Sequence, residues 1–223
     1  MASSSGDWST PPADDYEALI STTDVELLKR AWRNEKAAPE ILRYQEDLVK
    51  RAKEQIQLME ETVEEFAESG IDPLTVSLYQ MDLDRAQFLL RSYLRVRLLK
   101  IEKYVFHILK SDETESLLSE QEKMFARRCA DNMGEHLEDS DLLRLPDNYQ
   151  SVLKQSIISE EDDMVPQPEL ETFVVCKSKN FLSLNLYEDG ENPEMVEMDR
   201  GDLYFIRYKI IKRAVETGKI DLV

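Results

Sequence analysis

Apolar residues recur every three or four positions through the first two thirds of the chain, which is the spacing of an amphipathic helix. Two capping boxes mark helix starts, at Thr23 and at Ser119, each with a glutamate three residues later. Gly70 and Pro73 are typical of a helix end and a restart. The pattern therefore predicts four main helices, over residues 23–38, 39–69, 74–109 and from 119 onward, with a short helical piece near Leu142.

The period shortens toward two in the last quarter of the chain. Short β-branched or aromatic runs, separated by turn signals, predict strands, with a brief helix over residues 209–216 and a last strand in KIDLV. Residues 151–170 are acidic, contain prolines and lack apolar periodicity, which indicates a linker. We therefore expect a mainly α protein, with an N-terminal helical bundle over residues 23–150 and a small β-rich domain over residues 171–223.

The first 22 residues are rich in Ser, Pro, Asp and Thr, a composition that predicts a disordered tail. Within it, DDYEALI places two acids before apolar residues at one-turn spacing. The stretch is either ordinary tail or a short helix that folds on a partner. The candidate residues of this tail motif are Asp14, Asp15, Leu19 and Ile20.

The predicted helix over residues 74–109 contains RSYLRVRLLKIEKY, in which cations alternate with apolar residues. On a helical wheel the apolar residues span about 220°, whereas a helix at the edge of a globule needs only about 100°. This helix is therefore expected to be buried on at least two sides, within its own bundle or against another protein.

Arg97 falls inside the apolar sector of this helix, whereas Arg91 and Arg95 fall on its polar side. An unpaired buried charge is costly, so we expect Arg97 to be buried against carboxylates or carbonyl groups. Lys100, at the edge of the sector, could extend outward along its stem. The candidates for interface or core positions are Trp32, Tyr93, Arg97, Ile101 and Tyr104.

Charge separates two interpretations of the basic helix. The chain has a formal net charge of -18, yet residues 85–110 hold seven cations and one acid. A nucleic-acid-binding module using residues 91–110 is the alternative hypothesis. The aromatic residues share the apolar sector, however, and an acidic chain is repelled by phosphate, which argues against direct DNA binding.

No pattern in the sequence predicts an enzyme. The six glycines form no phosphate-binding loop, and two histidines give neither a catalytic triad nor a metal cluster, so no cofactor or metal is expected. Cys129 and Cys176 are far apart and are expected to be free thiols in a reducing compartment. No apolar run is long enough to predict a membrane span.

Three segments combine residue types in a recognisable way: AWRNEKAAPEIL (31–42), SYLRVRLLKIEKY (92–104) and IRYKIIKRAVETGKIDLV (206–223). They resemble the GINS family of eukaryotic replication proteins, and in particular its Sld-five type of subunit. The resemblance covers roughly residues 23–223. It implies a helical A domain followed by a small β-rich B domain.

The resemblance also implies a function. GINS proteins form a heterotetramer of four related subunits, so three other GINS subunits are expected as partners. The complex is a non-catalytic part of the replicative helicase in the nucleus. It joins the minichromosome-maintenance ring and the Cdc-forty-five cofactor in initiation and elongation. The tail motif is similar to a box that binds a trimeric replisome hub in some family members.

Replacing Leu19 and Ile20 by alanine is expected to weaken capture of a replisome hub while assembly is unaffected, because only the apolar side of the tail motif is removed. Pull-down from replisome extract with wild type and the double variant measures this. Equal recovery of the hub would contradict the interpretation of the tail as a binding motif.

Overall fold

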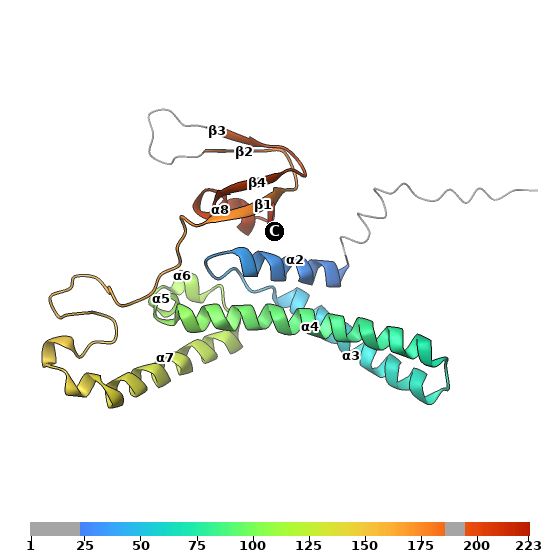
Figure 1. The fold of residues 1–223 in the computed structure, drawn as a ribbon, viewed down its shortest axis with the longest axis horizontal. Helices are drawn as coiled ribbons and strands as arrows, with labels where there is room; N and C mark the ends of the chain where they lie inside the picture. The colour runs from blue at the N-terminus through green and yellow to red at the C-terminus, as the bar shows by residue number, and fades with distance from the viewer. Residues whose placement is uncertain (1–22, 186–194) are drawn as a thin grey trace, which may run out of the picture.

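The computed structural model describes residues 23–185 and 195–223 (Figure 1). The helical part contains α2 (Asp24–Ala37), α3 (Glu46–Glu68), α4 (Pro73–Lys103), α5 (Val105–Lys110), α6 (Asp112–Glu115) and α7 (Glu120–Ser140). Two 3-10 turns follow, at Leu142–Arg144 and Asp147–Tyr149. Residues 150–172, which include the predicted linker, contain neither helix nor strand.

The long helices α3 and α4 form an antiparallel hairpin that projects from the rest of the molecule, and α2 packs across its base (Figure 1). The turn between them uses Gly70 at φ 72°, a conformation that glycine adopts without a Cβ penalty, and Pro73 begins α4. Apolar side chains at the base form one core, made by Leu28, Val49, Ala52, Leu90 and Tyr93.

The predicted second helix begins later than expected. A helix from residue 39 was predicted, but α3 begins at Glu46. Ala38 is extended, as is favoured before a proline, and the following backbone bonds to other parts of the chain. Tyr44 N–H donates to Leu117 O at 2.9 Å, and the carbonyl groups of residues 40 and 42 accept from α4. These tertiary hydrogen bonds replace the ones that a helix would have made.

The predicted helix over residues 74–109 is interrupted at Tyr104, which has φ -115° and ψ 23°. Beyond this residue α5 directs Val105 and Ile108 toward α7, where they form a second core with Ala126. The predicted capping box at Ser119 is confirmed: its hydroxyl accepts from Glu122 N–H, and the Glu122 carboxylate accepts from Ser119 N–H.

The C-terminal region is built from short strands around one helix. Its elements are β1 (Phe173–Ser178), β2 (Leu182–Asn185), β3 (Met195–Met198), β4 (Leu203–Arg207), α8 (Tyr208–Glu216) and β5 (Ile220–Leu222). The antiparallel sheet has the order β4-β1-β5, and β2 pairs with β3 separately. Alternate residues of β1, beginning at Val174, face α8, as the period of two predicted.

This β-rich region packs on its own helical bundle. Leu222 N–H donates to the Asn34 side chain at 2.7 Å, and Tyr208 Oη donates to Glu40 at 3.0 Å. Ala38 is buried in the same core as the sheet and α8. The docking surface is therefore α2 and the segment that follows it.

Removing residues 171–223 is expected to preserve the helical circular dichroism signal at 222 nm, apart from the contribution of α8, because both helical cores lie within residues 28–133. Thermal stability should fall by about 4–12 °C, since the apolar surface around Ala38 loses cover worth about 2–3 kcal/mol. Full-length Glu40→Ala removes only the polar contacts between the two regions. Its melting temperature should therefore lie between those of the wild type and the truncated chain. Collapse of the helical signal would mean that the bundle depends on the β-rich region to fold.

Candidate functional site

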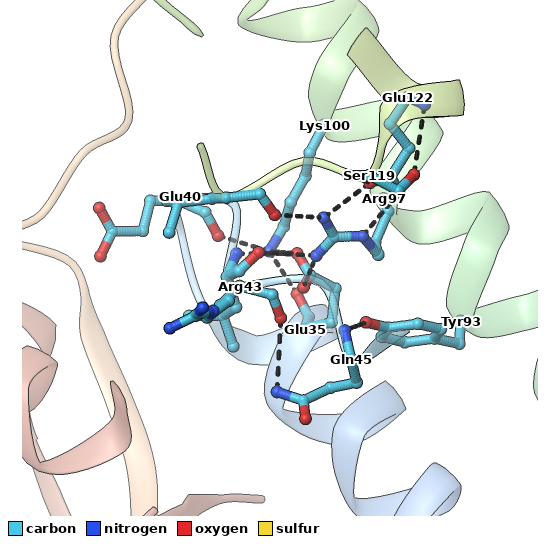
Figure 2. A network of polar contacts seen from close by, with 11 residues as sticks. Glu35, Glu40, Arg43, Gln45, Tyr93, Arg97, Lys100, Ser119 and Glu122 are labelled. Carbon is cyan, nitrogen blue, oxygen red and sulfur yellow. Dashed lines mark hydrogen bonds and ion pairs between the residues drawn. The ribbon is translucent and has the colours of Figure 1, made fainter. Parts of the chain in front are cut away.

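A buried network of charges lies at the centre of the helical bundle, around Arg97 of α4 (Figure 2). The Arg97 side chain is 0% exposed, as its place in the apolar sector predicted. Its Nε and Nη2 donate to the two carboxylate oxygens of Glu122, at 2.7 and 3.0 Å. Its Nη1 donates to Glu35 Oε2 at 2.9 Å and to Leu42 O at 2.7 Å, while Nη2 also reaches Leu117 O at 3.3 Å. The five N–H groups of the guanidinium therefore all have acceptors.

Lys100, one turn after Arg97, completes the network. The sequence left its ammonium able to extend outward, but in the structure it points inward and the side chain is only 12% exposed. Its Nζ donates to Glu35 Oε1 at 2.9 Å, to Glu40 O at 2.7 Å and to Glu35 O. Desolvation lowers the pKa of Lys100, although the charge of Glu35 acts against this.

Aromatic rings and a helix cap surround the guanidinium. The rings of Tyr44 and Tyr93 lie 5.3 and 5.8 Å from Arg97 Cζ, within the range of cation–π contact. Desolvation would lower the pKa of Arg97, but the hydrogen bonds to Glu122 and the charge of Glu35 outweigh it and raise the pKa. Burial raises the pKa of Tyr93 to about 12. The Glu122 carboxylate also accepts from Ser119 N–H at the start of α7, so it takes part in both the Arg97 network and the N-terminal cap of this helix.

The network is electrically balanced, with two cations and two carboxylates. It joins α2, α4, α7 and the two connecting segments around Leu42 and Leu117. Because the donors of both cations are used within the chain, the arrangement is a structural clamp rather than a site with an open position for a ligand.

The predicted candidates have different positions in the structure. Tyr93, Arg97, Ile101 and Tyr104 are buried, so these four belong to the core of the chain. Trp32 is partly exposed on α2 with Lys36 over its ring at 5.6 Å. The tail-motif candidates Asp14, Asp15, Leu19 and Ile20 lie outside the described residues.

Sequence reasoning did not identify the acidic partners of Arg97. Glu35 lies on the buried face of α2, seven residues after Leu28, so a carboxylate in an apolar stripe was the signal that could have found it. Glu122 was recognised only as a helix cap. The pairing itself joins residues 62 and 25 positions apart, which no local pattern encodes.

The outer side of α4 carries an exposed apolar stripe. Along it, Leu74, Leu78, Met81, Phe88 and Leu99 are between 50 and 67% exposed. Together with Arg85, Ser92 and Arg95, these residues recur at alternating spacings of four and three along α4. This is the seven-residue repeat of a surface that packs against another helix. We call this stripe the α4 seam. A stripe of this length on one helix is typical of a surface that another helix covers.

Residues 23–185 and 195–223 contain no cluster of three or more side chains that could hold a metal ion. No helix described there is long and apolar enough to span a membrane. Cys176 is buried, which raises the pKa of its thiol to about 11, so the thiol stays protonated at neutral pH.

Comparison with known proteins matches both parts of the fold. Residues 47–141 match the GINS complex protein helical bundle domain, and residues 168–223 match the C-terminus of the DNA replication complex GINS protein SLD5. A DNA replication complex GINS protein SLD5 from Arabidopsis thaliana is 76% identical over 209 residues, covering 94% of this chain and 95% of the relative.

More distant SLD5 relatives also match this chain over most of its length. The one from Homo sapiens is 33% identical over 207 residues, covering 89% of this chain and 88% of its own. The one from Schizosaccharomyces pombe is 30% identical over 202 residues, covering 90% and 92%. A helical bundle followed by a small β-rich region, with both parts matched, is the fold of a GINS complex protein, which confirms the predicted fold class. Within that class the chain belongs to the SLD5 family of DNA replication proteins.

Arg97→Ala is expected to destabilise the protein by about 3–5 kcal/mol, because two buried carboxylates lose their guanidinium. Arg91→Ala and Arg95→Ala are matched controls on the same helix, and because both side chains are exposed they should cost about 0–1 kcal/mol. Urea denaturation of the three variants measures the difference. Equal losses would contradict the buried-network interpretation.

Proposed function

We propose that this chain is a non-catalytic structural subunit of the GINS heterotetramer and assembles with the three other GINS subunits. Membership of the SLD5 family supports the assembly. The exposed α4 seam supports placing the interface with another subunit on this helix. The seam runs along a helix that the Arg97 network holds rigidly from the opposite side. Because the clamp fixes the helix, a partner meets a preformed surface.

The chemistry of the seam favours a helix of another subunit as its partner. Burying a Leu, Met or Phe side chain stabilises a complex by about 1.5–3 kcal/mol before entropic costs. Arg85 and Arg95 within the seam are exposed cations, and they would favour a partner with acidic residues at the edges of its contact surface. A face of this kind, left open in the isolated chain, is also expected to make that chain self-associate.

The wider role follows from the family. The complex would join the minichromosome-maintenance ring and the Cdc-forty-five cofactor, as an accessory of the replicative helicase in initiation and elongation. The work would take place in the nucleus. The tail motif over residues 14–20 would add a contact with a trimeric replisome hub.

The alternative function is a nucleic-acid-binding module that uses residues 91–110. The positions of the cations count against it. Arg97 and Lys100 are occupied inside the bundle, and Lys110 pairs with Asp162 at 2.7 Å. A salt titration of the purified assembly on DNA separates the two functions. Tight binding with a steep loss of affinity as salt rises would favour the alternative.

Met81→Glu with Phe88→Glu is expected to abolish recovery of the heterotetramer on co-expression with the other GINS subunits, because two carboxylates would be buried in the seam. Leu143→Glu, at a residue 63% exposed outside the α4 seam, is the matched control and should assemble normally. Size-exclusion chromatography with light scattering measures the complex. All of the variants should keep the wild-type stability of the chain within about 0.5 kcal/mol, since the changes are at surface positions. Full assembly of the double variant would place the interface elsewhere.

A further inference from the structure

The outer face of the C-terminal sheet is unusually apolar for an exposed surface. On β1 and β4 the outward side chains include Phe173, Val175, Leu203 and Phe205, which are between 39 and 70% exposed. The rings of Phe173 and Phe205 stack across the two strands, with centroids 5.1 Å apart. Two cations, Lys177 and Arg207, lie on the same face by the register of the sheet, and Arg207 Cζ is 5.6 Å from the Phe173 ring.

The backbone of β4 is also open at this place. Tyr208 N–H donates to Thr172 O at 2.9 Å, so the hydrogen-bonded pairs of the antiparallel ladder are those of Tyr204 and Ile206 with β1. The alternate residues Leu203, Phe205 and Arg207 then direct their N–H and C=O groups away from β1. Among the residues that the structure describes, the outward groups of Leu203 and Phe205 have no backbone partner, whereas the carbonyl of Arg207, the N-cap of α8, belongs to the first turn of that helix.

The opposite edge of the same sheet differs. There β5 is covered by α2, with Leu222 N–H donating to the Asn34 side chain at 2.7 Å. Asp221 of β5 pairs with Arg30 of α2 at 3.1 Å. Proteins usually cover or charge a sheet edge because an open one templates further strands. This sheet is closed at β5, and β4 presents large apolar side chains where protection would be expected.

We propose that β4 is a docking edge for an extended segment of another protein, which pairs with its backbone as an additional strand. The segment has apolar side chains at two alternate positions, which lie against Leu203 and Phe205. An acidic side chain two residues further lies against Arg207, while Lys177 lies at the other end of the ladder, opposite Leu203. Backbone pairing supplies the affinity, and this apolar–apolar–acid alternation supplies the specificity. The proposal concerns a surface other than the α4 seam and does not depend on it.

The geometry favours a strand over other occupants. A helix cannot use the open N–H and C=O groups, because its own are bonded internally. Single-stranded nucleic acid needs a groove that is positive along its length, whereas Lys177 and Arg207 lie at opposite ends of this face with apolar side chains between them. The net charge of -18 adds a further repulsion.

The test uses a fluorescein-labelled peptide, acetylated Glu-Thr-Val-Thr-Val-Thr-Glu amide, which presents the required pattern in either strand direction. Fluorescence anisotropy measures its binding to the full-length chain, alone and assembled with the other GINS subunits. Two further peptides carry N-methyl groups on one or the other set of alternate amides. A fourth replaces both glutamates by lysine.

Saturable binding is expected, with loss of about tenfold or more in affinity for one N-methylated peptide and not for the other, because only one set of amides faces β4. The lysine peptide should also bind more weakly. Phe205→Glu should remove binding, whereas Phe181→Glu, at a ring 60% exposed in the same region, should not. Slower hydrogen exchange at the amides of Leu203, Phe205 and Arg207 should accompany binding. Binding to the isolated chain that disappears in the assembly would identify a GINS subunit as the source of the strand.

Several results would overturn the proposal. Equal binding of both N-methylated peptides would show general apolar adhesion rather than strand pairing. A dimer of the chain that Phe205→Glu dissociates, and with which the peptide does not compete, would show that two β4 edges pair with each other. No binding to the isolated chain, whose β4 is open, would also refute it. Because Met81→Glu with Phe88→Glu leaves β4 intact, failure of assembly in that variant would not change any of these results.

Discussion

Burial of the Arg97 guanidinium is the constraint on which the rest of the helical bundle depends. A charge without solvent requires carboxylates and carbonyl groups in fixed positions, and five acceptors are present. Supplying them determines where neighbouring elements lie. Helix α2 must bring Glu35 inward, α7 must begin where Glu122 can reach, and the segment around Leu42 must stay extended to offer a carbonyl group. The packing of the helices and the pairing of the charges are therefore one arrangement.

The segment between α2 and α3 connects this network to the C-terminal region. Lys100 holds the carbonyl groups of Glu35 and Glu40 from the bundle side. The Glu40 carboxylate turns the other way and accepts from Tyr208 and Lys212. Burial, together with the charge of Glu40, raises the pKa of Tyr208, so its hydroxyl keeps the proton that it donates. One short stretch of chain is thus bonded on both sides.

Much of the fold could be predicted from local patterns. The period of the apolar residues predicted the helices and strands, and the angle of Arg97 predicted its burial. The errors arose where distant contacts outweighed local preference. Residue 39 is a good helix start by its proline, yet the backbone after it bonds to α4 instead. Lys100 looked free to extend outward because its partner, Glu35, is 65 residues away. The docking of β5 on α2 through Asn34 joins residues 188 positions apart and left no sequence signal.

The long separations within the Arg97 network have a consequence for how the bundle folds. A hairpin of α3 and α4 alone would contain the guanidinium but neither of its carboxylates, and α2 alone would carry Glu35 without a cation. In each fragment the charge must either stay in water, which leaves its face of the helix unburied, or be buried without a partner at a high cost, until α2 and α7 both pack against α4. Partial structures gain little, and the bundle should form in one cooperative transition whose barrier is the closure of loops 62 and 25 residues long. The charge that stabilises the finished bundle therefore also makes its intermediates scarce.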